Sequence, residues 1–325
     1  MRIVILDDYA DSVRSLTAFG QLREHDVVIY RDPVSSLGQW AERLAGAQAL
    51  VPIRERTAIN AAVLDYAPTL RIVSSAGSLP GNLDLDACTA RGIAVAQSRG
   101  SGHATAELCW ALILAAQRRL PEQIASLREG RWQGPLGRQL FGRQLGLWGF
   151  GRVAQQVAHY GKAFGMQVVV WGRASTLEKA QAAGYATAAS REALLAQADV
   201  LSLHLKLTPE TANLLSERDF AQMKPGAVFV NTARSGLVAR GALEAALARG
   251  QPALAAIDVF DDEPIFARTD PLLERDNVIA TPHIGFVEAD NFEAFFGGAF
   301  DNILRFEAGE TSHLVNHAAL VSQSR

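Results

Sequence analysis

The sequence predicts an α/β protein built from two doubly wound parallel-sheet domains. Its 325 residues are more than one hydrophobic core usually organises, so two domains are expected. Along most of the chain, short apolar runs alternate with helix-patterned segments, which is typical of parallel sheets covered by helices on both faces. A glycine-rich turn at 149–151 follows one apolar run and opens a second alternating series.

The first series covers residues 1 to about 100 and predicts a small α/β unit. Strands are predicted near 2–6, 26–30, 48–51, 70–73 and 92–95, and helices near 11–20, 36–45 and 59–66. The loop 76–81 follows a strand at its carboxyl end, where open α/β sheets bind ligands, although a plain turn has the same composition. The polar stretch 98–103 is interpreted as a hinge before a long apolar helix.

The second series predicts a full doubly wound domain. Segment 130–143 is expected to be a loop, at the surface or against a partner subunit, and a helix beyond Phe286 is expected to pack back on the first domain. Predicted helices include 190–197, with Ser190 as N-cap, and 239–249. Predicted strands lie near 144–148, 167–171, 199–203, 227–231, 253–257 and 277–280.

Composition excludes several classes of partner. A formal net charge of −3 gives no reason to expect nucleic acid or an anionic membrane surface. Cys88 and Cys109 are the only cysteines, and no cysteine or histidine cluster has metal-ligand spacing, so we expect buried thiols in a reducing cytoplasm and no metal site. No apolar run is long enough for a membrane span, and the first is too short for a signal peptide.

The stretch 144–154, QLGLWGFGRVA, predicts a dinucleotide-binding turn between a strand and a helix. Its glycines would let the backbone approach a pyrophosphate, and the helix start would direct N–H groups at that anion. Ala154 replaces the last glycine of the fingerprint, which requires only a small residue there. A structural strand–turn–helix corner is the alternative. The predicted cofactor contacts here are Gly149, Phe150, Gly151, Arg152 and Val153.

The end of the second strand of this domain bears on the choice between NAD and NADP. An acidic residue that would bind the adenosine ribose is absent, and Arg173, Ser175 and Thr176 stand in its place. A guanidinium and two hydroxyls suit a 2′-phosphate, so NADP is favoured over NAD. Alternatively, Arg173 stacks on the adenine or is solvated.

Three later strands end in residues suited to reducing a 2-keto acid. That reaction needs a cation to hold the carboxylate and polarise the carbonyl, together with a proton donor for the developing alkoxide. Arg234 is predicted as the cation, His283 as the donor and Glu263 as the carboxylate that orients the imidazole. His204, at another strand end, is a weaker candidate that would line the cofactor cleft.

An ordered series of motifs resembles the D-isomer-specific 2-hydroxyacid dehydrogenases, a group that includes D-3-phosphoglycerate dehydrogenases and hydroxypyruvate reductases. The motifs are DLDACTARGIAV, ATAELCWALILA, GLWGFGRVA, HLKLTPET, VNTARSGLV, AAIDVFDDEP and TPHIG. The resemblance implies a Rossmann nucleotide-binding domain, residues 102–287, inserted in a flavodoxin-like substrate domain, residues 1–101 plus 288–325. It also implies a homodimer and an oxidoreductase acting on a small 2-hydroxy acid.

The resemblance further implies individual roles. Arg234, Glu263 and His283 would be the catalytic residues, Asp258 would lie near the nicotinamide, Ala233 would bind the cofactor, and the backbone of Ala76, Gly77 and Ser78 would help hold the substrate carboxylate. The stretches SAGSLPGNLDL and IGFVEADNFEAFF depart from the family pattern, so the substrate is left unassigned.

Two other functions stay open at this point. A dinucleotide-sensing corepressor or scaffold could keep the same fold. A formate dehydrogenase also shares it, but the formate enzymes carry Gln where this chain has Glu263.

Overall fold

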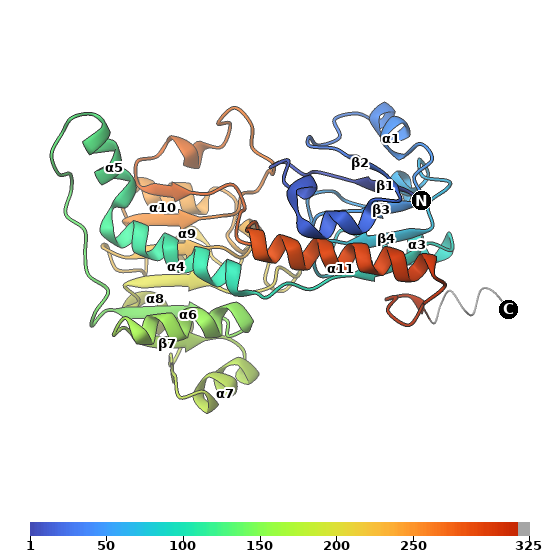
Figure 1. Cartoon of the computed structure of the whole chain (residues 1–325). Helices are drawn as coiled ribbons and strands as arrows, with labels where there is room; N and C mark the ends of the chain where they lie inside the picture. Colours follow the sequence, from blue (N-terminus) through green and yellow to red (C-terminus); the bar gives the residue numbers. More distant parts are fainter. Residues whose placement is uncertain (318–325) are drawn as a thin grey trace. The chain divides into compact units, whose positions relative to one another are not determined.

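The computed structural model describes residues 1–317, which divide into two compact units. One unit contains Met1–Ser101 together with the chain from Glu288 onward, and the other contains Gly102–Val287 (Figure 1). Residues 318–325, which the sequence prediction includes in the substrate domain, lie outside the described residues. Both units are built on parallel sheets, which confirms the predicted fold class.

The first unit is built on a five-stranded parallel sheet in the order β2-β1-β3-β4-β5. The second strand lies outside the first, which is the flavodoxin-like order that the family resemblance implies. The central strands read as apolar runs because both of their faces are covered. The strands are β1 (Arg2–Ile5), β2 (Asp26–Ile29), β3 (Ala49–Val51), β4 (Ile72–Ser75) and β5 (Ala94–Gln97).

The long helix α11 (Ala289–Glu307) returns to this sheet after the chain has formed the second unit, and it packs against β4 and β5. Phe296 and Phe300 are fully buried on its inner face. Asn302 Nδ2 donates to the Gln97 carbonyl oxygen at 3.0 Å, so polar bonds add to the apolar contact. The other α-helices of the unit are α1 (Leu37–Leu44), α2 (Ala61–Leu64) and α3 (Leu85–Ala90).

The predicted helix over 11–20 is wrong. Two 3-10 helices, η1 (Val13–Ser15) and η2 (Thr17–Leu22), take its place, separated by Leu16 in an extended conformation. The cause is tertiary, because the Glu293 carboxylate of α11 accepts the N–H groups of Thr17 and Ala18, at 2.5 and 2.9 Å. These bonds start a new turn at a place that local periodicity does not show.

The second unit is built on a seven-stranded parallel sheet in the order β12-β11-β10-β9-β6-β7-β8. The order reverses between β6 and β9, and ligands of doubly wound sheets bind at such a reversal. Six strands match the predicted positions closely, and the two-residue edge strand β8 was not predicted. The strands are β6 (Gln144–Trp148), β7 (Gln167–Trp171), β8 (Ala186–Thr187), β9 (Val200–Leu203), β10 (Val228–Asn231), β11 (Leu254–Ile257) and β12 (Val278–Ala280).

Helices cover both faces of this sheet. The Ser190 side chain accepts the Ala193 N–H at 3.1 Å, which confirms the predicted N-cap, and 130–143 is a loop as predicted. The α-helices are α4 (His103–Arg118), α5 (Leu120–Arg128), α6 (Arg152–Ala163), α7 (Ala174–Ala182), α8 (Arg191–Gln197), α9 (Glu217–Phe220) and α10 (Ala242–Ala248), with 3-10 helices η3 (Ser235–Leu237) and η4 (Pro271–Glu274).

Alternate residues of each strand contribute side chains to two separate hydrophobic cores. Val228 and Val230 of β10 join the core beneath α4 and α6, whereas Phe229 joins the core beneath α8, α9 and α10. The alternation follows from the two-residue period of a strand. Complete burial of a side chain such as Phe229 contributes about 2 kcal/mol to the free energy of unfolding. Within residues 1–317, the helices are too short or too polar to cross a membrane.

A buried polar chain links α4 to the end of β9. Cys109 Sγ lies 3.5 Å from Ser202 Oγ, which lies 3.0 Å from His204 Nε2. Burial raises the pKa of Cys109 to about 11 and lowers the pKa of His204 to about 4, so the thiol and the imidazole are both neutral near pH 7. Both cysteines are free and buried, as the sequence predicts.

We predict that His204→Gln flattens the dependence of stability on pH. The folded pKa of His204 is about 4 and its ordinary value is 6.5, so the unfolded chain takes up this proton first as the pH falls. As the pH falls over this range, this group lowers the free energy of unfolding of the wild type by up to about 1.4 kcal/mol per pH unit. The variant lacks this contribution.

Urea unfolding of both proteins between about pH 6.5 and about pH 4.5 measures the difference. Gln keeps a polar partner for Ser202, so the comparison isolates the titration. Equal pH slopes in the two proteins would contradict a buried neutral imidazole.

Candidate active site

The turn between β6 and α6 is shaped by its close approach to both neighbouring strands. Gly149 has a φ of +102°, which side chains of L-residues rarely allow. A Cβ here would lie 2.5 Å from the His204 carbonyl oxygen, so any side chain would displace the backbone. The Gly149 N–H donates to the Trp171 carbonyl oxygen at 2.8 Å. The turn is thus held between the ends of β7 and β9 and requires glycine.

The helix α6 begins at this turn with an uncapped amino end. Gly151 is the N-cap, no side chain bonds to the first N–H groups, and the first turn holds no acidic residue. A Cβ on Gly151 would meet no atom within 4 Å, so open space lies in front of the helix. Free N–H groups and the positive end of the helix dipole suit an anion such as the pyrophosphate of a dinucleotide.

The other residues predicted around this turn divide into two groups. Phe150 is buried against Tyr185, with ring centroids 5.5 Å apart, and Val153 packs on the core beneath α4 and α6. Phe150 therefore offers a ligand only its backbone, whereas the side chain of Val153 is partly exposed. Arg152, in contrast, has an exposed side chain at the start of the helix.

The end of β7 exposes Arg173 as the N-cap of α7, another helix whose start no side chain caps. The Thr176 side chain closes over Gly172, since a Cβ there would lie 2.7 Å from Thr176 Cγ2. The pKa of Glu210 is lowered by hydrogen bonds from Thr208 and from its own backbone, and further by the charge of Arg173. This strand end thus combines a guanidinium, a hydroxyl and free N–H groups with one nearby carboxylate.

Glu263 and His283 form a hydrogen-bonded pair. His283 Nδ1 lies 2.5 Å from Glu263 Oε2, and Glu263 Oε1 accepts the Phe260 N–H at 2.8 Å. The backbone therefore fixes the carboxylate, the carboxylate occupies Nδ1, and Nε2 is left to face another group. The imidazole also meets the Phe286 ring edge-on, with centroids 5.6 Å apart. The structure thus brings together the predicted proton donor and its predicted orienting acid.

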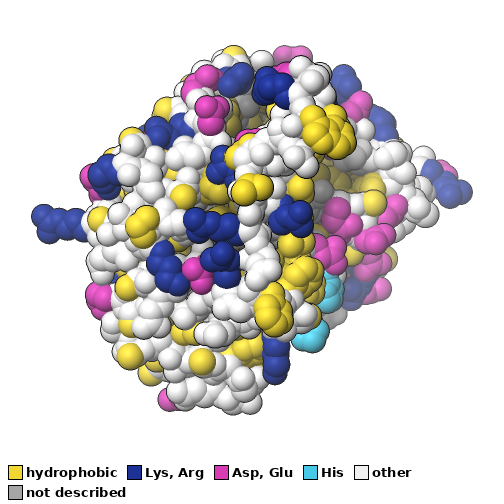
Figure 2. Space-filling view, turned by 90° about the vertical axis from the view of Figure 1, so that its left-hand side faces the viewer, with side chains coloured by type: hydrophobic (Ala, Val, Ile, Leu, Met, Phe, Trp, Pro, Cys, Tyr) yellow, Lys and Arg dark blue, Asp and Glu magenta, His cyan; other side chains and the backbone are white. Residues whose placement is uncertain are grey.

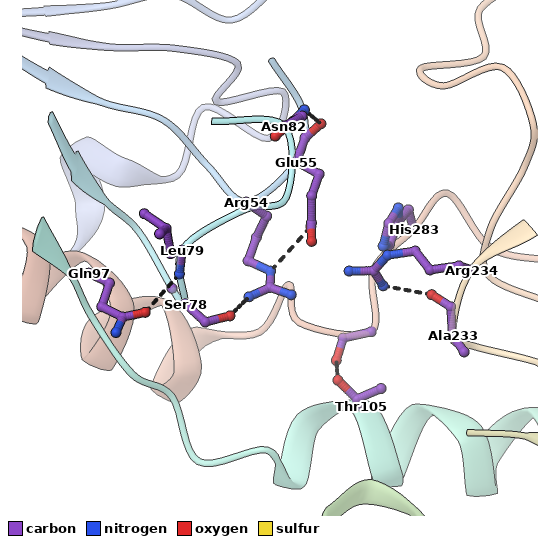
Figure 3. Close-up of polar contacts among 12 residues, drawn as sticks. Arg54, Glu55, Ser78, Leu79, Asn82, Gln97, Thr105, Ala233, Arg234 and His283 are labelled. Atoms are coloured by element: carbon purple, nitrogen blue, oxygen red, sulfur yellow. Dashed lines mark hydrogen bonds and ion pairs between the residues drawn. The ribbon is translucent and has the colours of Figure 1, made fainter. Parts of the chain in front are cut away.

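Arg234 lies in the turn that follows β10, and the Asn231 side chain stabilises this turn. Asn231 Nδ2 donates to the Arg234 carbonyl oxygen at 2.9 Å, and Asn231 Oδ1 accepts the Ala233 N–H at 3.0 Å. Arg234 Nη1 donates to the Ala233 carbonyl oxygen at 2.6 Å (Figure 3). The three predicted catalytic residues follow β10, β11 and β12, which are adjacent in the sheet.

Asp258 is fully buried, and its carboxylate holds the loop that carries His283. Oδ1 accepts bonds from Thr281 Oγ1 at 2.6 Å and from the Ile284 N–H at 2.8 Å, and Oδ2 accepts the Gly285 N–H at 2.7 Å. Burial raises the pKa of Asp258, and these hydrogen bonds oppose the rise. A carboxylate has about four acceptor positions, so little capacity remains for a ligand.

In the first unit, the predicted substrate loop uses most of its own N–H groups. The Ala76 N–H donates to the Pro52 carbonyl oxygen at 3.0 Å, and the Gly77 N–H donates to Ser98 Oγ at 2.8 Å. Among the described residues, the Ser78 N–H has no acceptor. Ser78 is therefore the member of the predicted trio whose backbone donor is available to a ligand.

Sequence reasoning did not single out Arg54, which adjoins this loop. Arg54 Nη1 donates to Ser78 Oγ at 2.6 Å, and Arg54 Nε lies 3.7 Å from Glu55 Oε2 (Figure 3). A Cβ on Gly77 would lie 2.8 Å from Arg54 Cδ, so the glycine makes room for the arginine. Arg54 follows β3 at its carboxyl end, and the strand-end reasoning that identified Arg234 could have found it.

Comparisons with known proteins agree with this architecture. The model of the NAD binding domain of D-isomer specific 2-hydroxyacid dehydrogenases matches residues 110–285. A D-3-phosphoglycerate dehydrogenase from Mycobacterium tuberculosis is 42% identical over 241 residues, which cover 73% of this chain and 45% of that protein. The chain thus spans about half the length of that relative. A glyoxylate reductase from Thermococcus litoralis is 34% identical over 310 residues, which cover 92% of each protein.

A crystal structure of a phosphoglycerate oxidoreductase from Vibrio cholerae o395 has the same fold, with a TM-score of 0.91 and 43% sequence identity. The similarity covers 95% of this chain and 99% of that one. Since the family model matches more than half of the chain and relatives align over nearly its full length, the chain belongs to the D-isomer-specific 2-hydroxyacid dehydrogenase family.

Proposed function

We propose that the protein is a nicotinamide-dependent oxidoreductase that interconverts a small 2-keto acid and the corresponding D-2-hydroxy acid. The hydrogen bond between Glu263 and His283 carries this proposal, because it pairs a proton-transfer group with an orienting carboxylate beside the strand end that bears Arg234. When bound at the start of α6, the cofactor supplies or accepts the hydride at the substrate carbon.

His283 acts as the proton donor in reduction. Since Glu263 holds Nδ1, Nε2 presents its proton to the substrate carbonyl oxygen. As the carbonyl carbon gains its electron pair, the proton passes from Nε2 to the oxygen, giving a hydroxyl group and a neutral imidazole. In oxidation the same nitrogen takes the proton back, and the Glu263 carboxylate stabilises the imidazolium that forms.

Arg234 binds the substrate carboxylate and polarises the adjacent carbonyl. Its planar guanidinium suits two-point bonding to a carboxylate, and the brace from Asn231 limits the positions that its backbone can take. In the first unit, the loop of Ala76, Gly77 and Ser78 offers a substrate the Ser78 N–H, because the other two N–H groups are bonded within the unit, and Arg54 is proposed as a further cation.

We assign the cofactor to the second unit, Gly102–Val287, which also carries Arg234, Glu263 and His283. The proposed cofactor residues are Gly149, Phe150, Gly151, Arg152 and Val153 at the pyrophosphate, Arg173 at the adenosine ribose, and Ala233 and Asp258 at the nicotinamide. NADP is preferred in this proposal, because Arg173, Thr176 and the uncapped start of α7 suit a 2′-phosphate.

We predict that His283→Ala lowers kcat by about a thousandfold for every 2-keto acid that the wild type reduces, because the proton donor is lost. Glu263→Gln keeps a hydrogen-bonding side chain but loses the charge, and kcat is expected to fall by about tenfold to a hundredfold. Initial rates on a panel of 2-keto acids measure both effects, with His159→Ala on the exposed side of α6 as control.

Unchanged kcat in His283→Ala would refute the proton-donor role. If the wild type itself bound NADPH but turned over no acid in the panel, a sensor or scaffold would explain the fold better than an enzyme.

We predict a higher kcat/KM with NADPH than with NADH, and we expect Arg173→Ala to lower kcat/KM for NADPH by about tenfold or more, the effect of losing charged hydrogen bonds. The value for NADH is expected to stay within about threefold, because NADH lacks the phosphate. Arg218→Ala, an exposed arginine on α9 of the same unit, is the control. A preference for NADH that Arg173→Ala leaves unchanged would contradict the assignment.

The protein is proposed to be a homodimer that associates through α5 and the loop that follows it. This stretch exposes apolar side chains that a monomer would bury, and Figure 2 shows hydrophobic side chains at the surface on the side of the molecule that carries α5. A self-complementary patch on one side of a chain favours a symmetric pair. The exposed residues are Ile124 (49%), Leu127 (62%), Trp132 (83%), Leu136 (95%) and Phe141 (72%).

We predict that the wild type has twice the 34.9 kDa chain mass in solution and that the double variant Leu127→Asp/Leu136→Asp is a monomer. Placing two carboxylates in an apolar interface raises the dimer dissociation constant by about a hundredfold or more. Light scattering after size-exclusion chromatography measures the mass. Leu37→Asp, at a leucine of the first unit that is 68% exposed, should remain dimeric. A double variant that stays dimeric would place the interface elsewhere.

A further inference from the structure

The first turn of α4 is tied to the loop that carries His283. Thr105 Oγ1 donates to the Gly285 carbonyl oxygen at 2.7 Å, the dashed contact drawn at Thr105 in Figure 3. Gly285 is buried, so without the hydroxyl its carbonyl oxygen would lack this partner away from solvent. The bond joins residues 180 positions apart in the chain, both within the second unit.

The loop is held from two sides. Asp258 accepts the N–H groups of Ile284 and Gly285 and the hydroxyl of Thr281, whereas Thr105 bonds to the carbonyl on the other side of Gly285. A Cβ on Gly285 would lie 3.0 Å from Asp258 Oδ2 and 3.4 Å from Thr105 Cγ2, so the peptide fits closely between the two side chains. Thr105 and Asp258 thus clamp one residue, Gly285, through its carbonyl oxygen and its N–H.

His283 lies next to this clamp in a backbone conformation that needs support. Its φ of +51° falls in the left-handed region, which costs a residue with a side chain about 1 kcal/mol or more. Its N–H donates to the Thr281 carbonyl oxygen at 2.9 Å, a short-range bond that closes the turn without anchoring it to the sheet. The anchors of the turn are therefore the bonds made by its neighbours, Thr281, Ile284 and Gly285.

We propose that Thr105 is a positioning residue for His283. Its methyl and hydroxyl groups fix Gly285, two residues beyond His283, and so set where Nε2 lies when Nδ1 is bonded to Glu263. The inference rests on the proposed function, in which Nε2 moves the proton. A displacement of about 1 Å in such a group lowers a rate by up to about a hundredfold.

The test compares three variants of the full chain. Thr105→Val keeps the shape and removes the hydroxyl, and Thr105→Ser keeps the hydroxyl. Thr69→Val removes a matched bond in the first unit, where Thr69 Oγ1 donates to the Ala47 carbonyl oxygen at 2.8 Å. We expect Thr105→Val to lower kcat by about tenfold while KM for the cofactor changes by less than about twofold. Thr105→Ser should recover most of the rate, and Thr69→Val should retain wild-type kcat.

Hydrogen–deuterium exchange without ligands provides a readout that does not depend on turnover. In Thr105→Val, peptides covering 281–287 are expected to exchange about tenfold faster, while peptides from β6 and β9 exchange as in the wild type. Uniformly faster exchange across the unit would mean that Thr105 only stabilises α4, and this would overturn the proposal. A kcat for Thr105→Val equal to that of Thr69→Val would overturn it as well.

A failure of the proposed function would be distinguishable from a failure of the positioning role. If His283→Ala leaves kcat unchanged, the proton-donor role is lost, whatever exchange shows at 281–287. If His283→Ala abolishes turnover and Thr105→Val matches Thr69→Val in both rate and exchange, only the positioning role fails.

Discussion

The second unit depends on one close approach, that of the Gly149 turn to the His204 carbonyl. Strands β6 and β9 are neighbours at the point where the strand order reverses, so the chain leaving β6 must turn directly against the end of β9. Because a Cβ on Gly149 would lie 2.5 Å from this carbonyl oxygen, position 149 cannot carry a side chain. With no side chain in the way, the start of α6 lies open to an anionic group.

Burial of the sheets on both faces explains why much of the fold could be predicted from the sequence. Strands of parallel sheets buried on both faces appear as short apolar runs, and every strand that is long enough to show such a run was placed within a few residues. The two-residue strand β8 is too short to give a pattern. The 3-10 helices after β1 depend on Glu293, which lies far along the chain, so local periodicity could not predict them.

One part of the candidate site could be predicted from the sequence and another part could not. Arg234, Glu263 and His283 each follow a strand of one parallel sheet, and the carboxyl ends of such strands share an edge, so their proximity could be argued from spacing alone. The bonds of Asp258 to the 281–285 loop and the contact of Thr105 with Gly285 are side-chain to backbone interactions between distant segments. Sequence patterns do not record such pairs. Whether a carboxylate faces a ligand or its own backbone is a property of the folded chain.

The doubly anchored 281–285 loop also bears on the thermodynamics of ligand binding. Its backbone is bonded to Asp258 and Thr105, which belong to the chain itself, so the entropy of ordering this loop is lost when the chain folds. A ligand that binds beside this loop therefore meets an imidazole whose backbone is already ordered, and none of its interaction energy is spent on arranging that segment. Discrimination between ligands then rests on the groups that each ligand contacts directly.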